Sequence, residues 1–207
     1  MTKKTEASKQ VSKGMDQQQK IPHYASFKAR FVSFLLDYLL IGAYILVLLV
    51  VAFFLASGPL RGAYQLLFSN PSNSEISAFL LLTLPVILYF AFSESSSAKA
   101  TWGKKRMQIE VVRNTADITA VRKVGLARSL LRSSVKFLPW ELAHYLLWQI
   151  PGWPFHIRGA SPPPSIEYGF GILYALVLVY FISVIFGKTH RSVYDRVAGT
   201  AVIHLHK

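Results

Sequence analysis

The fold of this 207-residue chain is decided by residues 24–56, YASFKARFVSFLLDYLLIGAYILVLLVVAFFLA. This stretch carries Arg30 and Asp37, and it then runs without charge from Tyr38 to Ala56. The uncharged run approaches the ~20 residues that a helix needs to cross a hydrocarbon core of about 30 Å. An acidic residue at the edge of such a run is costly unless it faces protein or water. The stretch therefore predicts a membrane-spanning helix with a polar site at its mouth.

The composition places the whole chain in the membrane class. Hydrophobic residues make up 52% and charged residues only 16%, whereas soluble domains carry roughly 25% charged residues. The net charge of +13 favours an anionic membrane surface over nucleic acid in so apolar a chain. Cysteine is missing from the sequence, which excludes disulfides and thiol catalysis. Residues 1–22 are expected to be a disordered basic cytoplasmic tail, and residues 23–207 the membrane domain.

Further apolar runs predict the remaining spans. Residues 76–92 and 168–186 are long enough to cross the bilayer. Residues 126–150 are less regular, because Pro139 interrupts them and ionisable side chains would lie at depth. We predict an all-α membrane protein with about four transmembrane helices, of which the third is irregular.

The positions of lysine and arginine predict the topology, because cytoplasmic loops collect these residues. They concentrate before residue 23, between residues 93 and 136, and after residue 187, while the other loops hold only Arg61 and Arg158. We therefore expect both termini in the cytoplasm, and an inner membrane of bacterial type as the location.

The polar stretch after the second span predicts short secondary structure on the cytoplasmic side. Residues 107–112 alternate as a strand does, and residues 200–206 are the expected partner strand. Residues 121–138 predict an amphipathic helix lying in the membrane interface, since bases recur there every four residues. Anionic lipid headgroups are the expected partners of five bases: Lys104, Lys105, Arg128, Arg132 and Lys136.

Four segments occur in a fixed order along the chain: ARFVSFLLD, TWGKKRMQIEVV, ARSLLR and SVYDRVAGTAVI. Together they resemble the RDD family of small multi-span membrane proteins. The family takes its name from one Arg and two Asp, which the resemblance assigns to Arg30, Asp37 and Asp195. Tyr194 stands where relatives often have His, and Trp102 stands where Pro or Leu is common. The resemblance implies a membrane role, for which transport is the usual suggestion.

Arg30, Asp37, Asp195 and Glu94 form the expected charge cluster at the cytoplasmic rim. Seven residues separate Arg30 from Asp37, about 10 Å along a straight helix, so each needs a partner from another element. The candidates for that partner are Asp195, Arg191 and Arg196, and also Glu94 and Lys104. The cluster either joins helix ends together or binds a cation or proton, and both readings stay open.

Two functions follow from these patterns. The first is transport of a small cation, proton-coupled, by a homo-oligomer or with a partner membrane protein. The alternative is a membrane interaction module that binds anionic lipid without transport. Glu141 and His144 lie one turn apart in the third span, and they belong either to a translocation route or to a shallow interface. The sequence shows no nucleophile motif, so we expect no enzyme, catalytic residue, cofactor, metal site or nucleic-acid partner.

Overall fold

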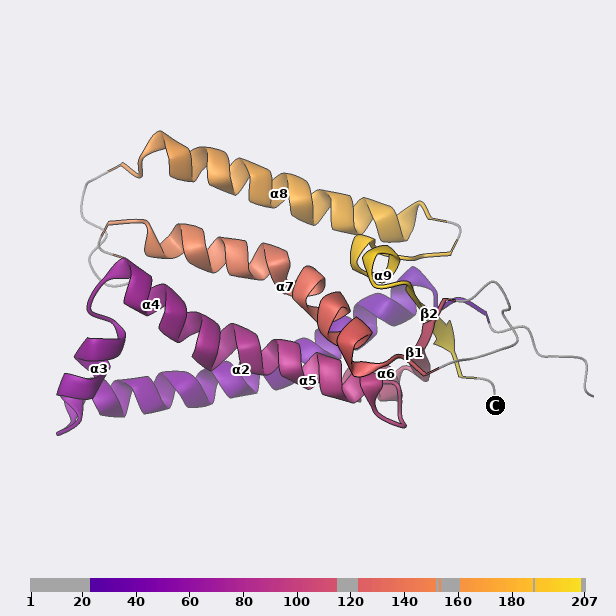
Figure 1. The fold of residues 1–207 in the computed structure, drawn as a ribbon, viewed down its shortest axis with the longest axis horizontal. Coiled ribbons are helices and arrows are strands. Elements are labelled where there is room, and N and C mark those ends of the chain that lie inside the picture. The colour runs from indigo at the N-terminus through magenta and orange to yellow at the C-terminus, as the bar shows by residue number, and fades with distance from the viewer. Residues whose placement is uncertain (1–22, 115–122, 152, 154–160, 188, 206–207) are drawn as a thin grey trace, which may run out of the picture.

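The protein is a bundle of long helices with a small polar assembly at one end. Its computed structural model describes residues 23–114, 123–151, 153, 161–187 and 189–205. Four long helical segments lie side by side, and two strands gather with two short helices where the first segment begins (Figure 1).

The first segment is α2 (Phe27–Ser57), whose start is capped by the Ser26 hydroxyl, which accepts a hydrogen bond from the backbone of Ala29. The helix buries only one residue per turn, in a narrow stripe. The stripe consists of Ala29, Ser33, Asp37 and Ile41. The second half of α2 is covered with exposed leucine, valine and phenylalanine, as expected of a surface that faces lipid.

The second segment is built from α4 (Pro71–Ala78), the π-helix η1 (Phe79–Thr83) and α5 (Leu84–Ser95), preceded by the short α3 (Arg61–Leu67). Pro85 is the second residue after the π-helix, and its missing N–H cannot bond the carbonyl of Leu81, four residues earlier. The hydroxyl of Tyr44, from α2, donates a hydrogen bond to that carbonyl. The π-turn before Pro85 is therefore stabilised by a neighbouring helix.

The third segment, α7 (Leu126–Trp148), runs through Pro139 without the break that the sequence predicts. Pro139 removes the hydrogen bond to the carbonyl of Val135, and the hydroxyl of Tyr180 replaces it at 2.6 Å. Tyr180 belongs to the fourth segment, α8 (Pro164–Ile185). A tyrosine from a neighbouring helix thus stabilises the chain at each of these two prolines.

Among the described residues, three stretches are long and apolar enough to cross a membrane. They are Phe27–Ser57, Pro71–Ser95 and Pro164–Ile185. The helix α7 has 23 residues and lies between α5 and α8, but it carries several charges (Figure 1). The predicted helical membrane protein is confirmed at this level of detail.

The cap, by which we mean α6 (Trp102–Arg106), β1 (Ile109–Arg113), α9 (Val193–Val197) and β2 (Thr200–His204), closes one end of the bundle (Figure 1). The two strands pair antiparallel, with Val111 opposite Val202, and the predicted β element is confirmed. Tyr24 forms a further bridge to Ile203, so the start of the described chain is tied to its end.

Candidate functional site

A network of buried charges lies where the helices meet the cap. We call it the charge network and define it as Arg30, Glu94, Lys104, Arg132 and Asp195. Its members come from α2, α5, α6, α7 and α9, and every side chain is at most 9% exposed. The network therefore connects three of the long helices to two elements of the cap.

Arg132 is the centre of the charge network. Its Nε donates to Asp195 Oδ1 at 2.9 Å, and its Nη1 donates to Glu94 Oε1 at 2.6 Å. A planar guanidinium suits this bridge, because its N–H groups point toward two carboxylates at once. The ring of Tyr194 stacks 5.1 Å from the guanidinium carbon.

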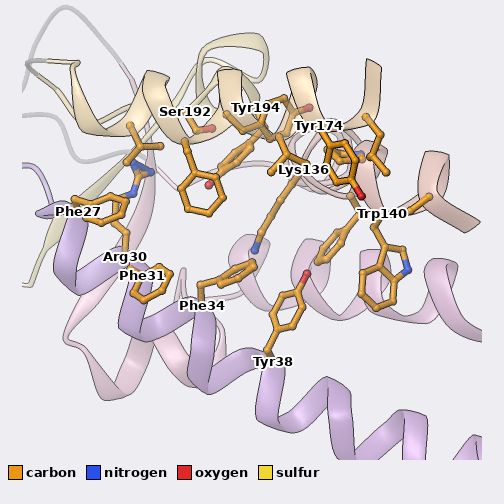
Figure 2. A pocket seen from close by; sticks show the side chains of 18 residues that line it. Phe27, Arg30, Phe31, Phe34, Tyr38, Lys136, Trp140, Tyr174, Ser192 and Tyr194 are labelled. Atoms are coloured by element: carbon orange, nitrogen blue, oxygen red, sulfur yellow. The ribbon is translucent and has the colours of Figure 1, made fainter. Parts of the chain in front are cut away.

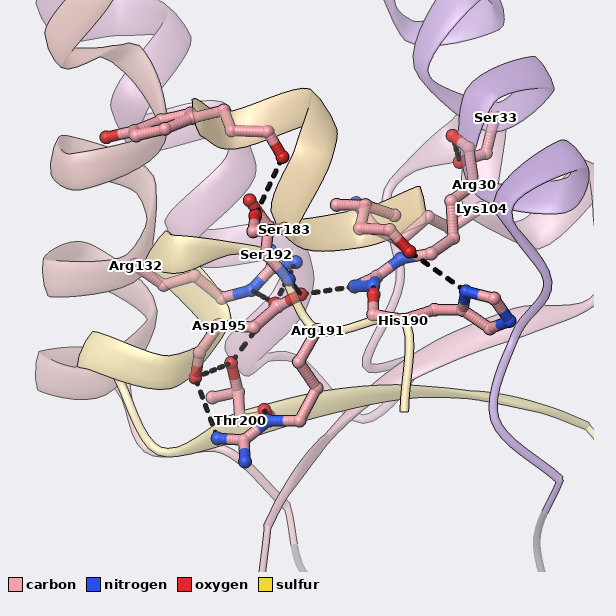
Figure 3. A network of polar contacts seen from close by, with 12 residues as sticks. Arg30, Ser33, Lys104, Arg132, Ser183, His190, Arg191, Ser192, Asp195 and Thr200 are labelled. Carbon is pink, nitrogen blue, oxygen red and sulfur yellow. Dashed lines mark hydrogen bonds and ion pairs between the residues drawn. The ribbon is translucent and has the colours of Figure 1, made fainter. Parts of the chain in front are cut away.

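Asp195 lies between two arginines, as Figure 3 shows. Arg30 pairs with its Oδ2, and the backbone N–H of Ser192 donates to the same oxygen at 3.1 Å. Burial raises the pKa of Asp195, but Arg30 and Arg132 outweigh this effect and hold the pKa below its usual value. Asp195 is therefore ionised, and it also caps α9.

Glu94 forms ion pairs with two bases of the charge network, Lys104 and Arg132. Lys104 Nζ lies 2.9 Å from Glu94 Oε1, and Glu94 is fully buried at the end of α5. Two cations on one carboxylate compensate the cost of burying it. The arrangement fixes α6 against α5 and α7.

Asp37 is also fully buried, yet its partners among the described residues are neutral donors. Its carboxylate accepts hydrogen bonds from Thr101 Oγ1 at 2.6 Å, from the Gly103 N–H at 2.8 Å and from Tyr89 Oη at 3.2 Å. Thr101 also lies 3.4 Å from Lys104 Nζ, which links Asp37 to the charge network. Asp37 therefore joins α2 to the start of α6.

This junction requires glycine at position 103. A Cβ there would lie 2.1 Å from the Ser33 carbonyl oxygen and 3.0 Å from the Asp37 carboxyl carbon. The missing side chain lets the α6 backbone approach α2 closely enough for the hydrogen bond to Asp37.

The structure brings the four residues of the predicted charge cluster to one end of the bundle. Arg30 and Asp37 do not pair with each other, and Arg30 pairs with Asp195 instead.

Four of the five bases expected at lipid headgroups divide into an exposed pair and a buried pair. Lys105 and Arg128 are exposed, while Lys104 and Arg132 are buried in ion pairs. The basic side of α7 thus faces the bundle at Arg132 but not at Arg128, and Leu131 and Leu138 on other sides of the helix are exposed.

Lys136, the fifth of these bases, lies one turn beyond Arg132 and points into a space lined with aromatic rings. Its Nζ is 3.6 Å from the centroid of Phe90, 5.2 Å from Phe137 and 5.4 Å from Phe34. Sequence reasoning missed both the role of Arg132 and this location of Lys136. The signal was present, because a polar stripe on a helix in a lipid-exposed protein is expected to face inward.

A second polar group lies further along α7, away from the cap. His144 Nδ1 is 3.7 Å from Glu141 Oε2 and 3.5 Å from the hydroxyl of Thr83 at the end of η1. Both ionisable side chains are partly exposed, at 20% and 26%. From the sequence, this pair belongs either to a translocation route or to a shallow interface.

The carboxylates beside the cap are therefore engaged by bases or by hydrogen-bond donors, an arrangement that stabilises the fold.

Neither curated protein sequences nor solved structures gave a match to this chain. The sequence profile of the RDD family matches residues 24–199, which includes Arg30, Asp37 and Asp195. With apolar helices and most of its length matched, the chain belongs to the RDD family of membrane proteins.

Proposed function

We propose that this RDD protein is a non-enzymatic membrane module that holds anionic lipid at its cap. The observation that carries the proposal is the separation of charges at that end. The acids Asp37, Glu94, Glu110 and Asp195 are all buried. Seven bases are exposed there: Lys28, Lys105, Arg106, Arg113, Lys123, Arg128 and Arg196.

Such a surface is positively charged although acids lie directly beneath it. Anionic lipid attracts basic residues near the membrane surface by about 1 kcal/mol each. Trp102, which is 42% exposed and lies 5.5 Å from the Arg106 guanidinium, adds an aromatic side chain of the kind found at membrane interfaces. The opposite end differs, since Glu167 and Arg61 are both exposed there.

We further propose that α7 also spans the membrane, as the third of four spans, and that both termini lie in the cytoplasm. An even number of spans returns the end of α8 to the side where α2 begins, and the exposed bases are on that side. In this topology the cap contacts the cytoplasmic leaflet, which is the anionic one. Assembly as a homo-oligomer or with a partner protein belongs to the same proposal.

The test is a titration of purified protein in non-ionic detergent with short-chain phosphatidylglycerol, with phosphatidylcholine of the same chain length as the neutral probe. Neutralising Lys105, Arg106 and Arg128 to glutamine should weaken phosphatidylglycerol binding by roughly 100-fold at low salt. The control is Arg61→Gln at the opposite end, which should leave the affinity unchanged. Equal affinity of the triple variant and the unmodified protein would overturn the proposal.

Proton-coupled transport of a small cation is the second candidate, favoured by Glu141 and His144 beside the π-helix. Ionisable residues within a membrane segment often mark ion pathways, and π-turns often occur at functional sites. Sodium uptake into vesicles that contain the purified protein tests it. Uptake that is lost in Glu141→Gln would support transport through this pair, and the same measurement on Asp37→Asn tests the family motif. Uptake equal to that of protein-free vesicles would exclude this candidate.

A further inference from the structure

A cavity of about 430 Å³ lies between α2, α7 and α8, next to the first residues of α9 (Figure 2). Its volume falls within the ~300–1,000 Å³ of small-molecule sites. Phe31, Tyr174 and Phe181 at its rim are exposed, so the cavity opens on the surface of the bundle. In a membrane, that surface contacts lipid.

Lys136 brings an amine into the cavity, and an anion bound beside that amine would favour its charged form. Figure 2 shows its side chain extending from α7 between the rings on α2, with the ammonium group beside Phe34. In the described part of the chain, no carboxylate forms an ion pair with Lys136, whereas Lys104 and Arg132 each have one. Aromatic rings stabilise such a cation only in part.

The protein supplies no carboxylate for a charged Lys136 among the described residues. Arg30, Lys104 and Arg132 are matched in number by the buried carboxylates Asp37, Glu94 and Asp195. The same ring of Phe90 contacts both Lys104 and Lys136. An anion in the cavity would neutralise a protonated Lys136.

The polar groups of the cavity lie toward the cap. Among apolar side chains, its lining there includes Arg30, Ser192 and Tyr194, and away from the cap it includes Ala143 and Leu173. The helices α2 and α7 run away from the cap (Figure 1), and Lys136 lies along α7 between Arg132, which pairs with the cap, and Ala143. A ligand with one charged end and one apolar chain fits this order.

We propose that the cavity binds a single-chain amphiphile with an anionic head, a carboxylate or a phosphate. The head pairs with the Lys136 ammonium, and the chain lies along Trp140 and Leu173 toward the middle of the bilayer. The ligand enters from the lipid side, past Tyr174 and Phe181. This site lies within the bundle and is separate from the exposed bases of the cap, so either proposal can fail without the other.

Quenching of tryptophan fluorescence by 9,10-dibromostearate tests the site, because Trp140 lines the cavity. The full-length protein is titrated in non-ionic detergent with the acid and with its methyl ester, which has the same chain and no charge. We expect the acid to bind at least 10-fold more tightly than the ester. We expect Lys136→Met to remove that difference and Lys136→Arg to retain it.

Two further variants locate the binding. Trp140→Phe should abolish most of the quenching, and Arg61→Gln, at the opposite end of the bundle, should leave the titration unchanged. Competition by oleate and by lysophosphatidate then distinguishes carboxylate from phosphate heads. If acid and ester bind equally to the unmodified protein, or if Lys136→Met keeps the preference for the acid, the proposal is overturned and Lys136 is only a packing residue.

Discussion

Two amino groups lie near the ring of Phe90, and their surroundings differ. On the cap side, Lys104 lies 5.1 Å from the ring centroid and pairs with Glu94 at 2.9 Å. On the cavity side, Lys136 lies 3.6 Å from the centroid and forms no ion pair among the described residues. The comparison teaches that the protein itself neutralises Lys104, while the amine of Lys136 is available to a ligand.

Arg132→Met should give the largest effect of any change on the cap side. It removes the base shared by Glu94 and Asp195 and leaves both carboxylates buried with fewer partners. Breaking a buried pair in this way costs about 3–5 kcal/mol of unfolding free energy. Thermal unfolding in detergent measures the loss. The exposed Arg128→Met, one turn earlier, should change stability by less than about 0.5 kcal/mol.

Gly103→Ala should destabilise the junction between α6 and α2 by about 1–3 kcal/mol, because the new methyl group would overlap the Ser33 carbonyl. The matched control is Gly42→Ala in α2, where a Cβ meets no atom within 4 Å. The same unfolding measurement compares the two variants. Equal stability in both would mean that Asp37 does not require this close approach.

Acid should weaken the cap side through Asp195. Because the folded pKa of Asp195 is depressed, its contribution to stability is fully present above the ordinary aspartate pKa of about 3.9 and is lost as the pH falls further. Melting temperatures between pH 7 and pH 3 should therefore decline on the acid side, and less steeply in Asp195→Asn. A parallel decline in both proteins would assign the acid sensitivity to other groups.

Lys136→Met should give the smallest effect on stability, within about 1 kcal/mol of the unmodified protein. The loss of contact between the ammonium and the rings is small, and an apolar side chain suits the cavity equally well. A loss of unfolding free energy as large as that of Arg132→Met would mean that Lys136, like Arg132, is needed for the fold.

The long helices could be predicted from the sequence because contact with lipid imposes apolar side chains on them. The β element could be predicted because residues 107–112 alternate in sequence and are rich in β-branched side chains, although the structure buries both faces of the two strands. The break expected at Pro139 was wrong for a reason that local sequence does not contain. The hydroxyl that replaces its hydrogen bond comes from Tyr180, 45 residues beyond Val135.

The candidate site was only partly predictable for a similar reason. Family resemblance singled out Arg30, Asp37 and Asp195, but their partners depend on how distant segments pack. The four-residue spacing of Arg128, Arg132 and Lys136 defines a stripe on α7, and periodicity alone does not say whether that stripe faces lipid or protein. In the structure, Arg132 and Lys136 face protein, while Arg128 at the start of the helix is exposed.

The pairing of Arg30 with Asp195 joins residues that are 165 positions apart. During synthesis the first helix therefore enters the bilayer long before its partner leaves the ribosome. Until then Arg30 must be accommodated by water, by lipid phosphate or by the insertion machinery. A chain cut short before residue 195 would keep this arginine unpaired at the membrane surface. Synthesis of the last short helix thus supplies the carboxylate that neutralises Arg30.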